Sequence, residues 1–326
     1  MRVLIVGEFD PTGYALRYRD WLGRIGVEVK TAVRDIWRAE WAGHDWIVGQ
    51  GQTQGLREYA ASCDVVILCP VIGQVWSCRE GEFHAHPEPD EDGMFPIDWG
   101  AVKHKVVLCH GSAILHQHAE RYADLYRGKG WTVAATTLDY RQRMDALYLR
   151  PVVDLEGCAP AELRLPGAML MVVHTPTAMN EGLYFSRAFV EMAGRLQGVT
   201  PAVFSGMSHR KILRIKAGFD AAFDHLRGSF SINSLENAGL GLVNLVGLRP
   251  EYREWMRANL GTAPDWPHVE NMGDVHDWIV RLRDDVKQCR RWQERGRRWF
   301  LEHWQPLDVA RDVAKTLETI VSGGCA

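Results

Sequence analysis

The sequence predicts an α/β protein built from two doubly wound, Rossmann-like domains that face a cleft. Residues 2–33 are arranged as strand, loop, helix and strand, and the same alternation begins again after residue 167. A chain of 326 residues is too long for one ordinary core and suits two domains of about 150 residues each. In such sheets the carboxyl ends of the parallel strands line the binding crevice, so ligand-binding residues are expected just after strands.

The first domain is predicted from short apolar runs that alternate with helical patterns. Strands are expected at residues 2–6, 27–33, 64–69, 105–109 and 132–136, and helices at 14–25, 56–62 and 120–126. The nearly unbroken apolar run at 64–69 is typical of a strand that is buried on both faces. The Pro- and Gly-containing stretch 157–167 is the predicted linker, which assigns residues 1–165 to the first domain.

The second domain is predicted over residues 166–304, followed by a last helical segment at 305–326. Strands are expected at residues 168–173, 201–204, 242–246 and 269–272, and helices at 182–196, 209–216, 275–286, 287–300 and 307–321. The Arg- and Trp-rich helix at 287–300 is interpreted as a solvent-exposed face, because Glu294 and Glu302 interrupt its positive charge at helical spacing.

Composition excludes several classes of protein. Hydrophobic residues make up 46% and charged residues 24%, and no run approaches the ~20 apolar residues that a membrane span requires. The seven cysteines include no C-x-x-C pair, which argues against a disulfide framework or a zinc ribbon and favours buried thiols in a reducing cytoplasm. A net charge of −3 gives no global attraction to nucleic acid.

The stretch 219–248 carries the main functional prediction. Ser231, Ile232, Asn233 and Ser234 precede or open a helix, where free backbone N–H groups and the helix dipole favour an anion such as a diphosphate. Glu236 lies about one turn further in, where its carboxylate is suited to accept hydrogen bonds from sugar hydroxyls. The combination predicts a site for a nucleoside-diphosphate sugar.

An acidic segment at residues 81–100 offers an alternative reading. His84, His86, Asp90, Glu91 and Asp92 carry groups that ligate metals, but their spacing matches no established coordination pattern. A solvated loop is the simpler interpretation, so no metal is expected.

The second half of the chain resembles the family-4-like group of retaining glycosyltransferases. The segment from Ser234 to Val243 is similar to the family's second glutamate and the glycine-containing stretch after it, and His174-Thr175-Pro176-Thr177 is similar to its first loop. Gly206-Met207-Ser208-His209 is similar to the entry to the nucleotide-base pocket, and Arg295 to Trp304 is similar to the late helix. The resemblance covers residues 168–322.

This resemblance implies a GT-B fold whose C-terminal helix crosses back to the first domain. It implies an acceptor domain at 1–165, a donor domain at 166–304, a nucleoside-diphosphate sugar as donor substrate, no required metal and no tightly bound cofactor. The implied donor-binding residues are His174, Thr175, Arg187, Met207, Ser208, Lys211, Ser231, Ile232, Asn233, Ser234 and Glu236.

Two positions depart from the family pattern. The first glutamate of the family's pair falls at Gly228, and Glu181 stands near the place of the lysine that neutralises the diphosphate. Arg187, Arg210 or Lys211 is expected to replace that lysine. A catalytically inactive binding protein therefore remains an alternative.

The first half contributes the predicted acceptor site. His110-Gly111-Ser112 is similar to a turn in small family-4-like enzymes of bacteriophages, and Thr136 to Asp139 is similar to another of their turns. The resemblance implies that His110 acts with Glu236 as a catalytic residue, and that Gly13, His110, Gly111 and Ser112 bind the acceptor. A structural role for a histidine after a strand is the alternative.

The predicted reaction is transfer of a sugar to a hydroxyl group with retention of configuration. One candidate acceptor is a hydroxymethylated pyrimidine in bacteriophage DNA, reached by base flipping in the host cytoplasm. A saccharide or small metabolite is the alternative acceptor. A nucleotide-sugar epimerase with the same fold is the alternative enzyme.

Overall fold

The computed structural model describes most of the chain as two compact units. The described residues are 1–7, 13–34, 43–51, 53–69, 95–109, 113–158, 169–173, 186–204, 207–226 and 228–323. Unit 1 comprises Met1–Val152 together with Pro306–Ala326, and unit 2 comprises Val153–Gln305. The acceptor and donor roles assigned to the two halves stay predictions.

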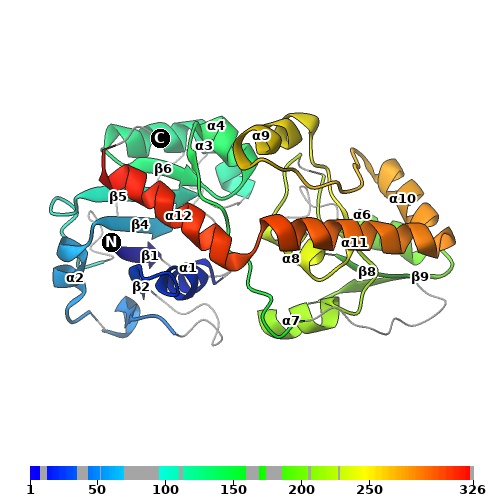
Figure 1. Ribbon diagram of the computed structural model, residues 1–326, viewed down its shortest axis with the longest axis horizontal. Coiled ribbons are helices and arrows are strands. Elements are labelled where there is room, and N and C mark those ends of the chain that lie inside the picture. Colours follow the sequence, from blue (N-terminus) through cyan, green and yellow to red (C-terminus); the bar gives the residue numbers. More distant parts are fainter. Residues whose placement is uncertain are drawn as a thin grey trace, which may run out of the picture. The chain divides into compact units, whose positions relative to one another are not determined.

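Unit 1 contains a parallel seven-stranded sheet, drawn in blue to green in Figure 1. The strands are β1 (Arg2–Gly7), β2 (Glu28–Val33), β3 (Trp46–Ile47), β4 (Val65–Cys69), β5 (His104–Cys109), β6 (Thr132–Ala135) and β7 (Leu147–Tyr148). Their order in the sheet is β3-β2-β1-β4-β5-β6-β7. The central strands β1 and β4 are apolar on both faces, as the sequence predicts for strands covered by helices on both sides.

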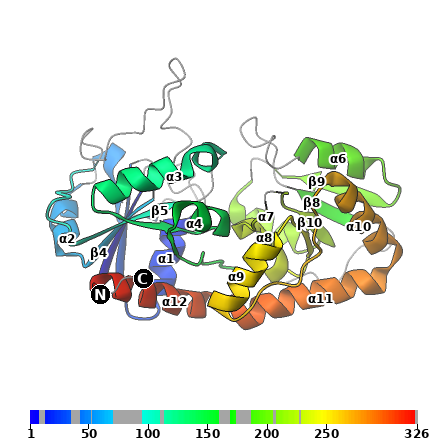
Figure 2. The same ribbon diagram turned by 90° about the horizontal axis from the view of Figure 1, so that it is seen from above.

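Helices cover both faces of this sheet. They are α1 (Tyr14–Gly23), α2 (Leu56–Ser62), α3 (Ala113–Gly128), α4 (Leu138–Met144) and α12 (Pro306–Val321), with a short 3-10 helix at Val48–Gln50. Figure 2 shows α3 on one face of the sheet and α1 with α12 on the other. Helix α12 packs on α1 through a buried stripe at positions 309, 310, 313, 314, 317 and 320, which is the spacing of an amphipathic helix.

Unit 2 contains a parallel four-stranded sheet in the order β11-β10-β8-β9. Its strands are β8 (Met169–Val173), β9 (Val199–Val203), β10 (Ala221–Phe223) and β11 (Val243–Leu245). Its helices are α6 (Ser186–Gly194), α7 (His209–Lys216), α8 (Ile232–Gly239), α9 (Pro250–Leu260), α10 (Met272–Asp284) and α11 (Val286–His303). One apolar cluster joins the sheet to α6 and α10. A second cluster joins the sheet to α7 and to the end of α8.

The predicted α/β class is confirmed, and helices α2 and α7 have the bounds that the sequence predicts. The strand predicted at 269–272 is wrong. His268 forms only an isolated bridge with Val246, and helix α10 already begins at Met272. Asn271 ends the extended stretch because its Oδ1 accepts a hydrogen bond from the Asp274 N–H at 3.0 Å, which completes a capping box.

No helix within the described residues is long and apolar enough to cross a bilayer.

The described cysteines are predicted to be chemically inert in the native protein. Cys63, Cys69, Cys109, Cys158 and Cys289 are all buried free thiols. Burial raises the pKa of Cys109 and, with the nearby Asp64 carboxylate, that of Cys63 to about 12. Because the thiolate is the nucleophile, we expect iodoacetamide at pH 8 to leave both unmodified until guanidinium unfolds the chain. Peptide mass spectrometry checks this result, and native modification at the rate of a free thiol would contradict it.

Candidate functional site

The candidate site lies at the carboxyl edge of the unit 2 sheet. Val173 pairs with Val203 on one side and with Phe223 on the other, and Phe223 pairs with Leu245, so all four strands end in register. The chain passes from β8 to β9 on one side of β8 and then to β10 on the other. This change of direction creates a topological switch point beside β8 and β10, where α/β sheets characteristically bind ligands.

Helix α8 begins at this edge and is capped by its own side chains. Ser231 is the N-cap, and its Oγ accepts hydrogen bonds from the backbone N–H groups of Asn233 at 3.0 Å and Ser234 at 3.4 Å. The Ser234 hydroxyl in turn accepts from the Ser231 N–H at 3.4 Å. The expectation of free amides is therefore wrong for the N–H groups of Asn233 and Ser234, because the Ser231 hydroxyl already accepts a hydrogen bond from each of them. The predicted donor contacts at Ser231–Ser234 themselves stay a prediction.

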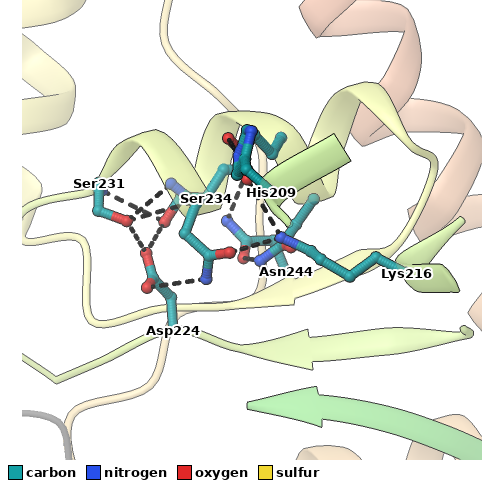
Figure 3. Close-up of polar contacts among 9 residues, drawn as sticks. His209, Lys216, Asp224, Ser231, Ser234 and Asn244 are labelled. Carbon is teal, nitrogen blue, oxygen red and sulfur yellow. Dashed lines mark hydrogen bonds and ion pairs between the residues drawn. The ribbon is translucent and has the colours of Figure 1, made fainter. Parts of the chain in front are cut away.

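Asp224, the residue immediately after β10, lies beneath the cap (Figure 3). Its side chain is completely buried and accepts hydrogen bonds from Ser231 Oγ at 2.7 Å, from Asn233 Nδ2 at 3.2 Å and from the Ser234 hydroxyl. Asp224 thus ties the end of β10 to the first turn of α8. The negative charge also complements the positive end of the helix dipole.

Glu236 lies in the second turn of α8 and joins two further elements. Its Oε1 is 2.8 Å from His209 Nε2 at the start of α7, and its Oε2 is 3.4 Å from Lys216 Nζ at the end of α7. Lys216 Nζ also donates to Asn233 Oδ1. Figure 3 shows these contacts as one continuous polar network running from Asp224 to His209.

Burial gives this network strong electrostatics. Lys216 is 2% exposed, which makes it the most buried cation among the described residues. Desolvation lowers the pKa of its ammonium group, and the negative charges of Glu236 and Asp224 act in the opposite direction. Glu236 thus contacts the buried ammonium group directly, and Asp224, whose Oδ2 lies 3.7 Å from His225 Nε2, attracts it without a direct contact.

The remaining donor residues predicted in unit 2 lie near the start of helices. Ser208 is the N-cap of α7, and its Oγ accepts from the Lys211 N–H at 3.3 Å. Met207 is half-buried, and Lys211 is exposed in the first turn of α7. Arg187 is exposed near the start of α6, which follows β8. The structure brings Met207, Ser208 and Lys211 into the same helix start as His209, which contacts Glu236.

Several predicted residues cannot be compared with the structure. His174 and Thr175 lie outside the described residues, as do His110, Gly111 and Ser112. Gly13 is described in unit 1, where it is the buried N-cap of α1 with φ 69°. The metal-ligand candidates at positions 84, 86 and 90–92 also lie outside, and no group of three or more His, Cys, Asp or Glu in the described part could hold a metal ion.

Gly228 stands where the sequence resemblance predicts a glutamate, and its backbone disfavours any side chain at that position. Its φ is +92°, and it pairs with Leu248 in an isolated bridge. A Cβ at this position would lie 2.4 Å from Arg249 Nε and 2.8 Å from Arg249 Cδ. A side chain is therefore opposed by the left-handed backbone and by the Arg249 side chain.

We expect Gly228→Ala to lower the free energy of unfolding by about 2 kcal/mol, because backbone strain and the contact with Arg249 add. The matched control is Gly261→Ala. Gly261 also has positive φ, at +70°, but a Cβ there would meet nothing within 4 Å, so its cost of about 1 kcal/mol reports strain alone. Urea unfolding of both variants measures the difference, and equal costs would mean that Arg249 moves aside freely.

Sequence reasoning missed Asp224 and Lys216, and it included His209 only in the segment similar to the base-pocket entry, without giving it a role. Asp224 follows a strand of three residues, too short to be recognised, although a carboxylate after the apolar run Ala221–Phe223 was a usable signal. His209 and Lys216 lie at the two ends of a helix that was correctly predicted. The sequence of this helix does not reveal that both side chains contact α8.

Solved structures with the same architecture are glycosyltransferases. A glycosyltransferase from Rickettsia africae ESF-5 is similar with a TM-score of 0.61 and 11% identity, over 99% of both chains. HepE of Anabaena, in complex with UDP and glucose, has a TM-score of 0.60 and 9% identity, over 98% of this chain and 100% of that chain. Sucrose-phosphate synthase from Thermosynechococcus elongatus has a TM-score of 0.58 and 9% identity, over 99% of this chain and 100% of that chain.

These similarities establish the fold. No protein-family model matches the sequence, and no curated protein matches it. The match to solved structures nevertheless extends over nearly the whole chain, and it confirms the predicted GT-B fold class.

Proposed function

We propose that this protein is a glycosyltransferase that moves a sugar from a nucleoside-diphosphate sugar to a hydroxyl acceptor. The observation that carries the proposal is the buried Glu236 carboxylate on α8, at the carboxyl edge of the parallel sheet of unit 2. The similar fold of HepE, which was solved with UDP and glucose, supports a nucleotide-sugar donor. The sequence motif around Glu236 and the similarity in fold are independent observations, and both support a glycosyltransferase.

In this proposal Glu236 accepts hydrogen bonds from the ribose hydroxyls. Each carboxylate oxygen can accept more than one hydrogen bond, so the contacts of Glu236 with His209 and Lys216 are compatible with hydrogen bonds from the ribose. Met207 and Ser208 border the base through backbone groups, and His174 and Thr175, which follow β8 in the sequence, contact the donor. These contacts do not distinguish between donor bases, and the comparison of UDP- and GDP-sugars described below identifies the base.

The diphosphate is proposed to lie near the first turn of α8, between Ile232 and Ser234. The helix dipole favours an anion there, but the Ser231 cap and the Asp224 carboxylate already use part of this positive end, so most of the diphosphate charge is proposed to be matched by cationic side chains. Arg210 and Lys211 are exposed in the first turn of α7 and make no ion pair within the described residues, so they are available to the diphosphate. Arg187 is proposed as a third cation at this site. No metal or tightly bound cofactor is required in this scheme.

The chemistry is proposed to proceed with retention of configuration. The bond from the anomeric carbon to the diphosphate oxygen breaks, and the acceptor oxygen bonds to the anomeric carbon on the same face. The departing diphosphate oxygen takes the proton of the acceptor hydroxyl. Positive charge and helix amides stabilise the leaving group, while His110, with Gly13, Gly111 and Ser112, holds the transferred sugar or the acceptor.

Two acceptor classes are proposed for this enzyme. One is a hydroxymethylated pyrimidine in bacteriophage DNA, for which binding weakens steeply as salt rises because phosphate contacts release counterions. The other is a saccharide or small metabolite, whose binding is nearly independent of salt. Retention of the protein on hydroxymethylated DNA between 50 and roughly 200 mM salt separates the two.

Product analysis tests the proposed function. The purified protein is incubated with UDP- and GDP-sugars, and nucleoside diphosphate is measured with and without hydroxyl acceptors. Release that depends on an acceptor supports a transferase. Conversion of the sugar without an acceptor would identify an epimerase, and binding without turnover would identify an inactive nucleotide-sugar binding protein.

A further inference from the structure

Lys216 is a buried charge that the proposed reaction does not use. It ends α7, and its ammonium group lies 3.4 Å from Glu236 Oε2 and donates to Asn233 Oδ1. Removing a lysine ammonium group from water costs several kcal/mol, and an apolar side chain of similar size would avoid that cost. Stability alone therefore gives little reason for a lysine at this position.

The geometry around Glu236 indicates what the lysine does. The two carboxylate oxygens have separate partners, His209 on Oε1 and Lys216 on Oε2. Both partners come from α7, at its first and last residues, so the helix holds the carboxylate at two points. A glutamate with several free torsions is thereby restricted to one orientation, so the directions from which its oxygens can accept a further hydrogen bond are fixed.

Asn233 extends this restraint to the start of α8. Its Oδ1 accepts from Lys216, and its Nδ2 donates to Asp224 at 3.2 Å. The same ammonium group therefore fixes the carboxylate that is proposed to bind ribose and the turn that is proposed to face the diphosphate. A side chain without hydrogen-bond donors at position 216, such as methionine, could not hold both.

We infer that Lys216 is a positioning residue that orients the Glu236 carboxylate toward the ribose hydroxyls and so determines the preference for ribonucleotide over deoxyribonucleotide donors. The inference rests on the proposed function. It concerns a contact through Glu236, since Lys216 itself touches neither the nucleotide nor the reacting atoms.

Nucleotide binding tests the inference with Lys216→Met, which keeps the length of the side chain and removes its charge. Calorimetry compares UDP with 2′-deoxy-UDP and GDP with 2′-deoxy-GDP. For the base that binds, the wild-type protein is expected to prefer the ribose form by at least about tenfold, as for one hydrogen bond to a charged acceptor. In Lys216→Met the preference falls below about threefold, because the ribose form loses affinity while the deoxyribose form keeps its own.

The matched control is Arg214→Met, on the same helix. Arg214 is exposed and belongs to no part of the network, so its loss leaves the preference at the wild-type value. A folded Lys216→Met variant that retains the wild-type preference would overturn the inference and leave the proposed function intact. Failure of the wild-type protein to bind either ribonucleotide would instead count against the proposed function.

A second measurement applies even where Lys216→Met does not fold. In a crystal structure of the wild-type protein with the bound nucleoside diphosphate, Lys216 Nζ is expected to stay within hydrogen-bonding distance of Glu236 while Glu236 accepts from the ribose. A Glu236 side chain that leaves Lys216 in order to reach the ribose would overturn the inference.

Discussion

Replacing Glu236 by alanine is expected to raise the Kd for the donor nucleotide roughly 100-fold. Two ribose hydroxyls lose hydrogen bonds to a charged acceptor, at a cost of about 3 kcal/mol. Glu236→Gln keeps the shape and one acceptor oxygen but removes the charge, so an increase of about tenfold is expected. Calorimetric titration with UDP and GDP measures both.

The Glu236→Ala result needs a check on folding, because the substitution leaves the buried Lys216 ammonium group without its carboxylate. The double variant Lys216→Met/Glu236→Ala removes both charges. It is expected to bind the donor nucleotide as weakly as the Glu236→Ala variant does. Glu191→Ala is the matched control, since Glu191 is an exposed residue of α6. Donor affinity within threefold of wild type in a folded Glu236→Ala protein would mean that the nucleotide binds elsewhere.

Replacing Asp224 by asparagine is expected to destabilise unit 2 by about 3 kcal/mol and to lower its Tm by roughly 6–12 °C. The completely buried carboxylate accepts hydrogen bonds from Ser231, Ser234 and Asn233, and an amide turns one acceptor oxygen into a donor facing these donors. The Lys216 ammonium group also loses one of its two nearby negative charges. Differential scanning calorimetry measures the change.

An exposed ion pair in the same unit provides the control for Asp224. Asp265 lies 3.3 Å from Arg295, and both side chains are more than half exposed. Solvent screening leaves such a pair worth less than about 1 kcal/mol, so Asp265→Asn shifts the Tm by only a few degrees. If Asp224→Asn were as mild as Asp265→Asn, the cap of α8 would not depend on the carboxylate beneath it.

The sequence predicted those parts of the fold in which local chemistry determines local structure. Helix α8 was recognisable because Ser231 marks its start and Gly239 and Gly241 its end. Helix α7 was predicted with correct bounds. Glu236 was singled out because the recognisable start of α8 at Ser231 places Glu236 about one turn into the helix.

The missed features depend on contacts between distant parts of the chain. Lys216 and Glu236 are 20 residues apart, and nothing in either helix indicates that these two side chains meet. Strand β10 has only three residues and is stabilised by the neighbours β8 and β11 rather than by its own composition. Helix α9 was overlooked although Pro250 at its first position and Gly261 at its end are standard boundary residues.

Helix α12 affects the order in which the chain can fold. Unit 1 is discontinuous, and the whole of Val153–Gln305 is synthesised between its two pieces. A ribosome therefore releases all of unit 2 before the apolar stripe of α12 becomes available to cover α1. During translation unit 2 can therefore fold before unit 1 is complete. Until α12 has been synthesised, the apolar face of α1 is uncovered, which is the kind of surface that chaperones bind.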